Sequence, residues 1–193
     1  MKKELQKKLY EQYPAIFRQK DLDKTQTAMC WGISCGDGWY NILDTLCFHL
    51  QNLVDQPHKD IEMYKSWLQK EQEKDADVNE EWIKRCKLLI KESQEKTISQ
   101  IEAAQVKEKY GTLRFYLSGY PANKTVDAQV RAYINFAESL SGRTCEMCGI
   151  PAKQKTGGWI KTICEPCEEK RSQEWQKERI DSKQLKIPFP EEK

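Results

Sequence analysis

Two cysteine pairs with the same internal spacing constrain this chain more than any other feature. Cys145 and Cys148 form one Cys-x-x-Cys pair, Cys164 and Cys167 form the other, and fifteen residues separate Cys148 from Cys164. Two intervening residues let a tight turn aim both sulfur atoms at one point, and Gly149 permits the backbone to swing around that point. The spacing predicts one structural zinc ion per chain, held by four thiolates at Zn–S distances of ~2.3 Å.

Other uses of paired cysteines fit this sequence less well. A redox dithiol of the thioredoxin kind needs one pair in a βαβ setting, whereas this chain has two pairs. A catalytic zinc site keeps one position open for water, which a four-cysteine shell does not offer, and no histidine lies near these cysteines. We therefore expect the metal to hold a small module together.

The residues between and after the pairs predict the fold of this module, residues 144–180. Residues 156–159 contain two glycines and predict a hairpin turn, and residues 160–163 predict a strand leading into the second pair. Pro166 and the acidic residues beside it suit the first turn of a helix. A knuckle, a hairpin and a helix in this order are typical of a treble-clef zinc finger. A zinc ribbon, with the second pair in another hairpin turn, is the alternative.

Hydrophobic periodicity predicts that residues 1–143 form a mainly helical body. Apolar residues recur there at three- and four-residue steps, which is the pattern of amphipathic helices. The segments with this pattern are a short helix before Pro14 and residues 37–54, 61–68, 82–101 and 127–140. We interpret the charged stretch from about 55 to 104 as an antiparallel helical hairpin inserted into the body, with its break at residues 75–79.

One β-hairpin completes the expected fold. Residues 112–117 alternate apolar and polar side chains, which is the period of a half-buried strand, and Gly111 supplies a turn to a partner strand at 105–108. The predicted class is α+β: a mainly helical body with a small β-hairpin and a C-terminal treble-clef-like or zinc-ribbon module. Residues 181–193 are expected to form a tail.

The charge balance excludes a general attraction to polyanions. Lys and Arg number 32, Asp and Glu number 30, and the formal net charge is only +2, so any basic surface must be local. Residues 1–14 have no apolar run typical of a secretory signal, and no stretch approaches the ~20 apolar residues that cross a bilayer. We expect a cytoplasmic protein with no membrane partner.

The Gly-Asp-Gly-Trp turn at residues 36–39 is a candidate ligand site. Its glycines permit close backbone approach, and the N-terminus of the helix after it can hold an anion. Asp37 and Gly38 would contact the ligand, while Trp39 and Tyr40 would offer rings for stacking. The alternative interpretation is a helix that Asp37 caps, with the aromatic residue anchored in the core.

Two further candidate sites in the body have weaker support from the sequence. Asp37 and Asp44 lie on one predicted helix face and would make a hydrolytic pocket, but no further acid–base partner accompanies them. A second metal site would need Cys30, Cys35, Cys47 and His49. The spacing argues against it, because side chains two residues apart on a helix point in different directions.

Two surfaces combine basic and aromatic side chains, a combination that can bind single-stranded nucleic acid. The first is the outer face of the β-hairpin, with Lys107, Arg114 and Tyr116. The second lies between the cysteine pairs, with Lys153, Lys155, Trp159 and Lys161. The alternatives are solvated cross-strand pairs in the first case and a tryptophan packed over the zinc site in the second.

Taken together, these motifs resemble a group of small proteins encoded by phages and prophages. The resemblance rests on the turn at 35–39, the Val-Lys-Glu-Lys-Tyr-Gly-Thr-Leu-Arg-Phe-Tyr segment at 106–116 and the paired cysteines, and it excludes the charged stretch at 55–104. It carries no activity to this chain. It implies a phage accessory protein that works in a bacterial cytosol.

We therefore expect a zinc-stabilised, non-enzymatic binding protein that engages or blocks a host protein or sequesters a host signalling molecule. No catalytic constellation is convincing, whereas surface helices, a zinc module and exposed aromatic residues suit recognition. One alternative is a nucleic-acid-binding regulator that uses the zinc module. Another is a small-ligand-binding or hydrolytic pocket at the turn of residues 36–39. A homo-oligomer is compatible with each of these functions.

Overall fold

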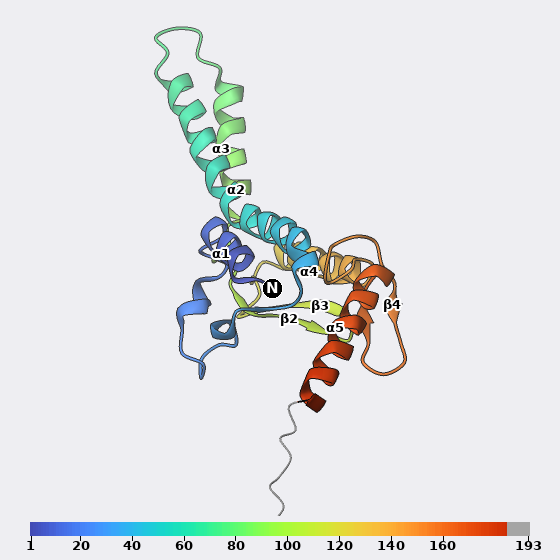
Figure 1. The fold of residues 1–193 in the computed structure, drawn as a ribbon. Helices are drawn as coiled ribbons and strands as arrows, with labels where there is room; N and C mark the ends of the chain where they lie inside the picture. The colour runs from blue at the N-terminus through green and yellow to red at the C-terminus, as the bar shows by residue number, and fades with distance from the viewer. Residues whose placement is uncertain (185–193) are drawn as a thin grey trace, which may run out of the picture.

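A computed structural model, which describes residues 1–184 and the side chains of residues 1–177, has a small β-sheet under two long helices (Figure 1). The fold is mixed α+β, as the sequence predicts. In chain order the elements are α1 (Lys3–Gln12), η1 (Arg18–Asp21), η2 (Met29–Trp31), β1 (Ile33–Ser34), η3 (Asp37–Trp39), α2 (Tyr40–Gln72), α3 (Glu80–Gln94), β2 (Ala103–Lys109), β3 (Thr112–Leu117), α4 (Lys124–Ser141), β4 (Gln154–Lys155), β5 (Lys161–Thr162) and α5 (Glu165–Gln184).

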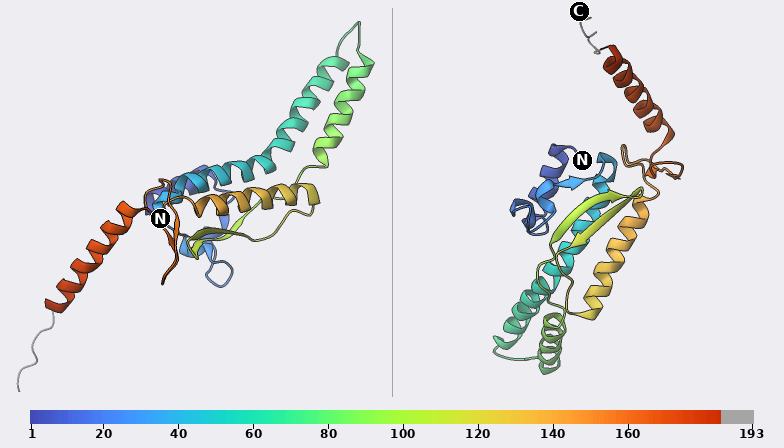
Figure 2. Two further views of the ribbon diagram at one scale, coloured as in Figure 1. Left: turned by 90° about the vertical axis from the view of Figure 1, so that its right-hand side faces the viewer. Right: turned by 90° about the horizontal axis from the view of Figure 1, so that it is seen from below.

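Helix α2 is longer than the sequence pattern predicts. The prediction ended one helix near residue 54 and placed a second at 61–68, but a single helix continues through Pro57 to Gln72. A proline inside a helix removes one backbone hydrogen bond and bends the axis without necessarily ending the helix. Here the core holds the first half of α2, while α3 packs against the second half and forms with it an arm that projects from the body (Figure 2).

The tip of this arm is closed by side chains from both helices. Glu71 accepts a hydrogen bond from the backbone N–H of Asn79 at 2.8 Å, and Asn79 in turn accepts one from the N–H of Trp82 at 2.9 Å. This confirms the predicted helix break at 75–79. The predicted continuation of the second helix to Ile101 is wrong: α3 ends at Gln94, and Ile101 is buried in the main core.

The sheet has the strand order β1-β2-β3, with β1 parallel and β3 antiparallel to β2. Leu113 and Phe115 are buried, while Arg114 and Tyr116 alternate with them on the outer face, as predicted. The free edge of β3 is covered by α4. Ser141 Oγ accepts a hydrogen bond from the N–H of Leu113 at 2.8 Å, and a carboxylate oxygen of Glu138 accepts one from Phe115 at 3.1 Å. Such cover prevents another strand from pairing there.

The main core lies between the sheet and helices α2 and α4. Its largest fully buried side chains are those of Trp39, Phe17, Phe115, Leu9, Ile16, Met29, Leu43, Leu50, Leu113, Val106 and Val130. A second, much smaller cluster surrounds Cys145, Ile163 and Cys164. Among the helices in residues 1–184, none is long and apolar enough to cross a membrane. The expected tail begins within α5, and residues 185–193 lie outside the described part of the chain.

Candidate metal centre

The four cysteines of the two pairs converge on one point. The Sγ atoms of Cys145, Cys148, Cys164 and Cys167 all lie within 4.8 Å of one another, and those of Cys148 and Cys164 are 3.6 Å apart. A tetrahedral shell with Zn–S bonds of ~2.3 Å has sulfur–sulfur edges of roughly 3.8 Å. A disulfide would need about 2.05 Å. The sulfur positions therefore fit a tetrahedral metal site and not a disulfide.

The chain builds the first half of this site as a tight turn. The N–H of Gly149 donates to the carbonyl of Cys145 at 2.9 Å, and the N–H of Cys145 donates to the carbonyl of Ile150 at 2.8 Å. Gly149 has a φ of 81°, in the left-handed region that glycine adopts without strain. Residues 145–149 thus form a knuckle that directs Cys145 and Cys148 toward the second pair.

The second half of the site is the start of α5. Strands β4 and β5 form the predicted hairpin, and α5 begins directly after it at Glu165. Cys164 immediately precedes the helix, and Cys167 lies in its first turn. The N–H of Glu168 donates to the carbonyl of Cys164 at 3.0 Å, which fixes this turn. The elements follow the predicted order of knuckle, hairpin and helix.

The charge environment of the cluster favours a bound cation. Burial raises the pKa of the Cys145 thiol, but the backbone N–H groups of Cys164, Cys148 and Met147 donate to its sulfur and lower the pKa to about 7. By contrast, hydrogen bonding with Cys148 and Cys164, together with burial, raises the pKa of Cys167 to about 12. Without a metal, the four neighbouring thiols therefore do not all ionise readily. A bound divalent cation would allow all four to be thiolates, because a coordinating thiol is deprotonated outright.

The Gly-Asp-Gly-Trp turn lies directly against this knuckle. The N–H of Gly38 donates to the carbonyl of Glu146 at 2.8 Å, and the N–H of Gly36 donates to the Glu146 carboxylate at 2.9 Å. A Cβ on Gly38 would lie 2.2 Å from the carbonyl oxygen of Cys145 and 2.4 Å from the nitrogen of Gly149. A Cβ on Gly36 would lie 2.2 Å from the carbonyl oxygen of Glu146. Both glycines are needed because two backbones approach closely here.

Trp39 adds a side-chain contact to the same interface. Its side chain is fully buried, and its indole N–H donates to the carbonyl of Thr144 at 2.8 Å, one residue before the first cysteine of the cluster. The ring of Trp39 is therefore a core anchor and offers no open face to a ligand. Together with the glycine contacts, this makes residues 36–39 the seat on which the knuckle docks; we call them the knuckle seat.

The carboxylate of Asp37 does not cap helix α2. It accepts a hydrogen bond from the backbone N–H of Lys2 at 2.7 Å and forms an ion pair with the Lys2 ammonium at 3.4 Å. The cap prediction is wrong because α1 is close enough to engage this carboxylate first. Asp44 accepts a hydrogen bond from the Tyr13 hydroxyl at 2.8 Å. Each carboxylate is thus bound to a different partner. Tyr40 is half-buried and Trp39 is fully buried, so the two rings do not form the open stacking platform that the sequence suggested.

The structure does not bring together the residues that the second metal site would need. Within residues 1–177, the Cys145–Cys167 cluster is the only group of three or more side chains placed to share a metal ion. Cys30 donates to the carbonyl of Thr27, Cys35 and Cys47 are buried thiols, and His49 stacks on the ring of Tyr133 at 5.0 Å. Burial raises the pKa of Cys35 to about 12.

The basic and aromatic residues are placed as follows. Arg114 forms an ion pair with Glu138 at 3.4 Å, and Lys107 lies over the ring of Tyr116, which is 40 % exposed, with its ammonium 5.7 Å from the ring centre. Trp159 is 79 % exposed, so it is not packed over the cysteine cluster. Lys155 forms an ion pair with Glu168, and Lys153 and Lys161 flank it on the hairpin.

Sequence reasoning missed an apolar groove between α2 and α4, which we call the α2–α4 groove. Its volume is about 410 Å³. Its lining residues are Asn41, Ile42, Thr45, Leu46, His49, Tyr133, Phe136, Ala137 and Leu140. The signal for it was present in the sequence, because Phe136 and Leu140 lie off the apolar stripe that α4 turns toward the core.

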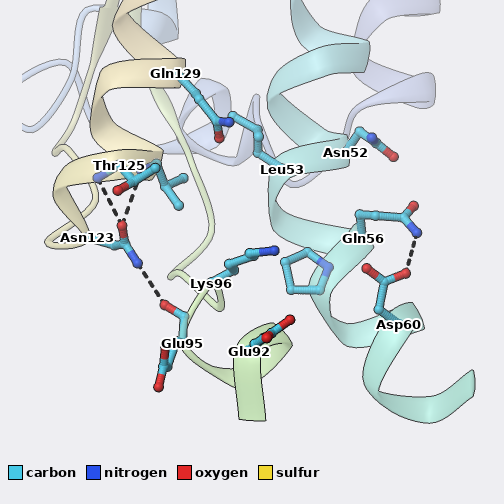
Figure 3. A pocket seen from close by; sticks show the side chains of 12 residues that line it. Asn52, Leu53, Gln56, Asp60, Glu92, Glu95, Lys96, Asn123, Thr125 and Gln129 are labelled. Carbon is cyan, nitrogen blue, oxygen red and sulfur yellow. Dashed lines mark hydrogen bonds between the residues drawn. The ribbon is translucent and has the colours of Figure 1, made fainter. Parts of the chain in front are cut away.

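A second cavity, of about 530 Å³, lies where the arm leaves the body (Figure 3). Lys96 extends into it toward α2, with Glu92 of α3 beneath it and Asp60 of α2 on the far side of the cavity. Asn123 donates to the carbonyl of Glu95 at 2.7 Å and also caps helix α4. The polar groups of this cavity therefore connect the base of the arm to α4.

Comparison of the chain with known protein families, with curated proteins and with solved structures finds no match. The fold and the site by themselves define the class: a mixed α+β protein in which four cysteines, placed to share a metal ion, are docked against the core.

Proposed function

We propose that this chain is a zinc-stabilised, non-enzymatic binding protein that engages another protein through the α2–α4 groove. The resemblance to phage-encoded proteins makes a host protein in a bacterial cytosol the expected partner. The groove carries the proposal, because it combines an apolar floor from both helices with exposed apolar side chains on α4.

The chemistry of the four ligands supports zinc as the metal. A closed shell of four cysteine thiolates is a structural zinc site, and soft sulfur ligands select zinc over magnesium or calcium. The order of knuckle, hairpin and helix supports a treble-clef finger, with Cys164 and Cys167 at the first turn of α5. In this role the metal stabilises the fold and takes no part in a reaction.

The composition of the groove indicates what it would bind. None of its nine lining residues is Asp, Glu, Lys or Arg. Ile42, Leu46 and Ala137 form the floor, while Phe136 is 69 % exposed and Leu140 is 40 % exposed at the wall. Contiguous exposed apolar surface on a soluble protein marks an interaction site. The partner must therefore present an apolar anchor, as an amphipathic helix does when it packs into a groove between two helices.

Site-specific photocrosslinking tests this function. A benzophenone amino acid at Phe136 is expected to give covalent adducts to one defined protein in host cells, identified by mass spectrometry. The same amino acid at Leu88, which is exposed on α3 but far from the groove, is the matched control. Identical adduct patterns from both positions would remove the groove from consideration. Adducts only to a second copy of this chain would show that the groove is a dimer interface.

Phe136→Asp is expected to abolish capture of the crosslinked partner and leave the fold intact. The side chain of Phe136 is 69 % exposed, so its replacement is expected to change stability by no more than about 0.5 kcal/mol. A charge in an apolar interface remains unpaired and costs several times that amount in binding. The measurement is a pull-down with the purified partner, with the melting temperature and zinc content as controls. Undiminished capture by this variant would contradict the proposal.

A further inference from the structure

The outer face of the sheet and the β4–β5 hairpin form one continuous surface, although they are far apart in the sequence. Gln154 of β4 donates to the carbonyl of Tyr110 in the β2–β3 turn at 2.6 Å. Thr162 of β5 donates to the carbonyl of Gly111 at 2.5 Å. The hairpin is thus fastened to the end of the sheet. Figure 2 shows it continuing from the β2–β3 turn and reaching past the sheet on the side away from α2 and α4.

We propose that this combined surface is a binding site for single-stranded nucleic acid. The site comprises Lys107, Lys109, Tyr110, Tyr116, Lys153, Trp159 and Lys161, and we call it the basic–aromatic face. It is separate from the α2–α4 groove, because the two share no residue and the helices that line the groove lie on the opposite side of the sheet (Figure 2). The inference therefore does not depend on the function proposed for the groove.

The register of the sheet puts the basic side chains on the open side. Val106, Leu113 and Phe115 face the core, so their neighbours point outward by the two-residue period of a strand. Lys107 lies directly opposite Arg114 in the β2–β3 ladder. This places the positive charge of β2 on the face of the sheet turned away from the core, where Lys109 is exposed and Lys107 is partly exposed.

The charge on this face is available for phosphate. Lys107, Lys109 and Lys153 form no ion pair among residues 1–177, whereas Arg114 and Lys155 are paired with glutamates and are left out of the site. Two acidic groups close to this face are engaged by backbone N–H groups. Glu108 accepts a hydrogen bond from the N–H of Gly111 at 2.6 Å, and Glu146, whose charge also attracts Lys161, accepts one from Gly36.

Exposed rings alternate with these cations, which favours a single strand over a duplex. Trp159 is 79 % exposed, Tyr110 is 66 % exposed and Tyr116 is 40 % exposed. The ammonium of Lys109 lies 5.3 Å from the centre of the Tyr110 ring, so charge and ring act at one place. Bases of a single strand can stack on such rings, with about 1–3 kcal/mol per base, whereas duplex bases are already stacked. RNA and DNA share this chemistry.

Fluorescence anisotropy with labelled oligonucleotides tests the proposal on the full-length, zinc-loaded protein. The probes are oligouridylate and oligothymidylate of about fifteen nucleotides, which separate RNA from DNA, and a duplex of the same length. If each of the four lysines of the site contacts one phosphate, the plot of log affinity against log salt concentration has a slope of about −2.8. This corresponds to roughly 50-fold weaker binding over a fourfold rise in salt concentration. Binding of the duplex is expected to be weaker than binding of either single strand.

Two variants separate charge from stacking. The double variant Lys107→Gln, Lys109→Gln is expected to reduce the salt slope by about 1.4. Trp159→Ala is expected to weaken binding by roughly 5- to 150-fold with the slope unchanged. The matched control, Lys65→Gln with Lys70→Gln, removes the same charge from exposed positions on the arm and should bind as wild type.

The proposal is overturned if the wild-type protein binds neither oligonucleotide at about 50 mM salt, or if the control double variant loses as much affinity as Lys107→Gln, Lys109→Gln. Zinc content and melting temperature exclude unfolding as the cause of any loss. Phe136→Asp should leave oligonucleotide affinity unchanged, so failure at this face and failure at the groove can be told apart.

Discussion

Loss of the metal is expected to unfold residues 144–167 and to loosen the first turn of α2 with them. The cysteine module cannot support itself without the metal, because its own buried cluster consists of only Cys145, Ile163 and Cys164. In small zinc modules the metal contributes about 10–16 kcal/mol of apparent binding energy, and that energy is also folding energy. Removing it leaves a segment with too little buried surface to remain folded.

The effect should spread to the body through the knuckle seat. Gly38 bonds to Glu146 of the knuckle, and Trp39 in the main core bonds to Thr144. When the knuckle unfolds, the indole N–H of Trp39 is left buried without a partner, which costs about 1–3 kcal/mol. The arm formed by the second half of α2 and α3 makes no such contact and should stay folded.

Hydrogen exchange read by mass spectrometry measures this gradient. Cys145→Ser, or chelation of the wild-type protein, should bring exchange in residues 144–167 close to that of an unfolded chain, with a smaller increase at residues 36–43. Cys30→Ser is the matched control, because Cys30 is half-buried and lies outside the cluster. Metal analysis should find about one zinc per wild-type chain and none in Cys145→Ser. A Cys145→Ser protein that keeps its zinc and its exchange pattern would contradict a metal site at these residues.

The cysteine cluster and most helices could be predicted from the sequence, because their signals are local. Metal-ligand spacing, apolar periodicity and the break at 75–79 each depend on residues close together in the chain. The length of α2 could not be predicted this way. Pro57 is a local signal to stop, and it is overridden by the packing of α3 against the far half of the helix, a contact between segments that the sequence pattern does not connect.

The structural role of the Gly-Asp-Gly-Trp turn could not be predicted from the sequence, for a similar reason. Glycines that permit close backbone approach look the same in sequence whether the approaching group is a ligand or another part of the chain. Here the group is the backbone of residues 144–149, more than a hundred positions away, and Asp37 is taken by Lys2. The separate basic–aromatic patches were visible in the sequence, but their continuity depends on Gln154 and Thr162 reaching the β2–β3 turn.

Gly38→Ala is expected to destabilise the protein, although it adds only one methyl group. Gly38 does not have a positive φ, so alanine is allowed by the backbone at this position. At an unstrained open site the same change stabilises a protein by about 0.4–1 kcal/mol. At Gly38 the new Cβ would lie 2.2 Å from the Cys145 carbonyl oxygen and 2.8 Å from the Cys148 nitrogen, both backbone atoms of the knuckle. Because these atoms cannot rotate away as a side chain would, the knuckle must shift, at a cost of about 1–3 kcal/mol or more.

Gly119→Ala is the matched control, because a Cβ at Gly119 meets no atom within 4 Å. In a chain of this length each kcal/mol changes the melting temperature by about 2–4 °C, so Gly38→Ala should melt roughly 2–12 °C lower and Gly119→Ala at or above the wild-type temperature. Gly38→Ala should also release zinc to a competing chelator faster, since the knuckle that holds Cys145 and Cys148 is the part displaced. Equal melting temperatures for the two alanine variants would show that the seat and the knuckle do not form one cooperative unit. A lower melting temperature with unchanged zinc release would show that the turn stabilises the body alone.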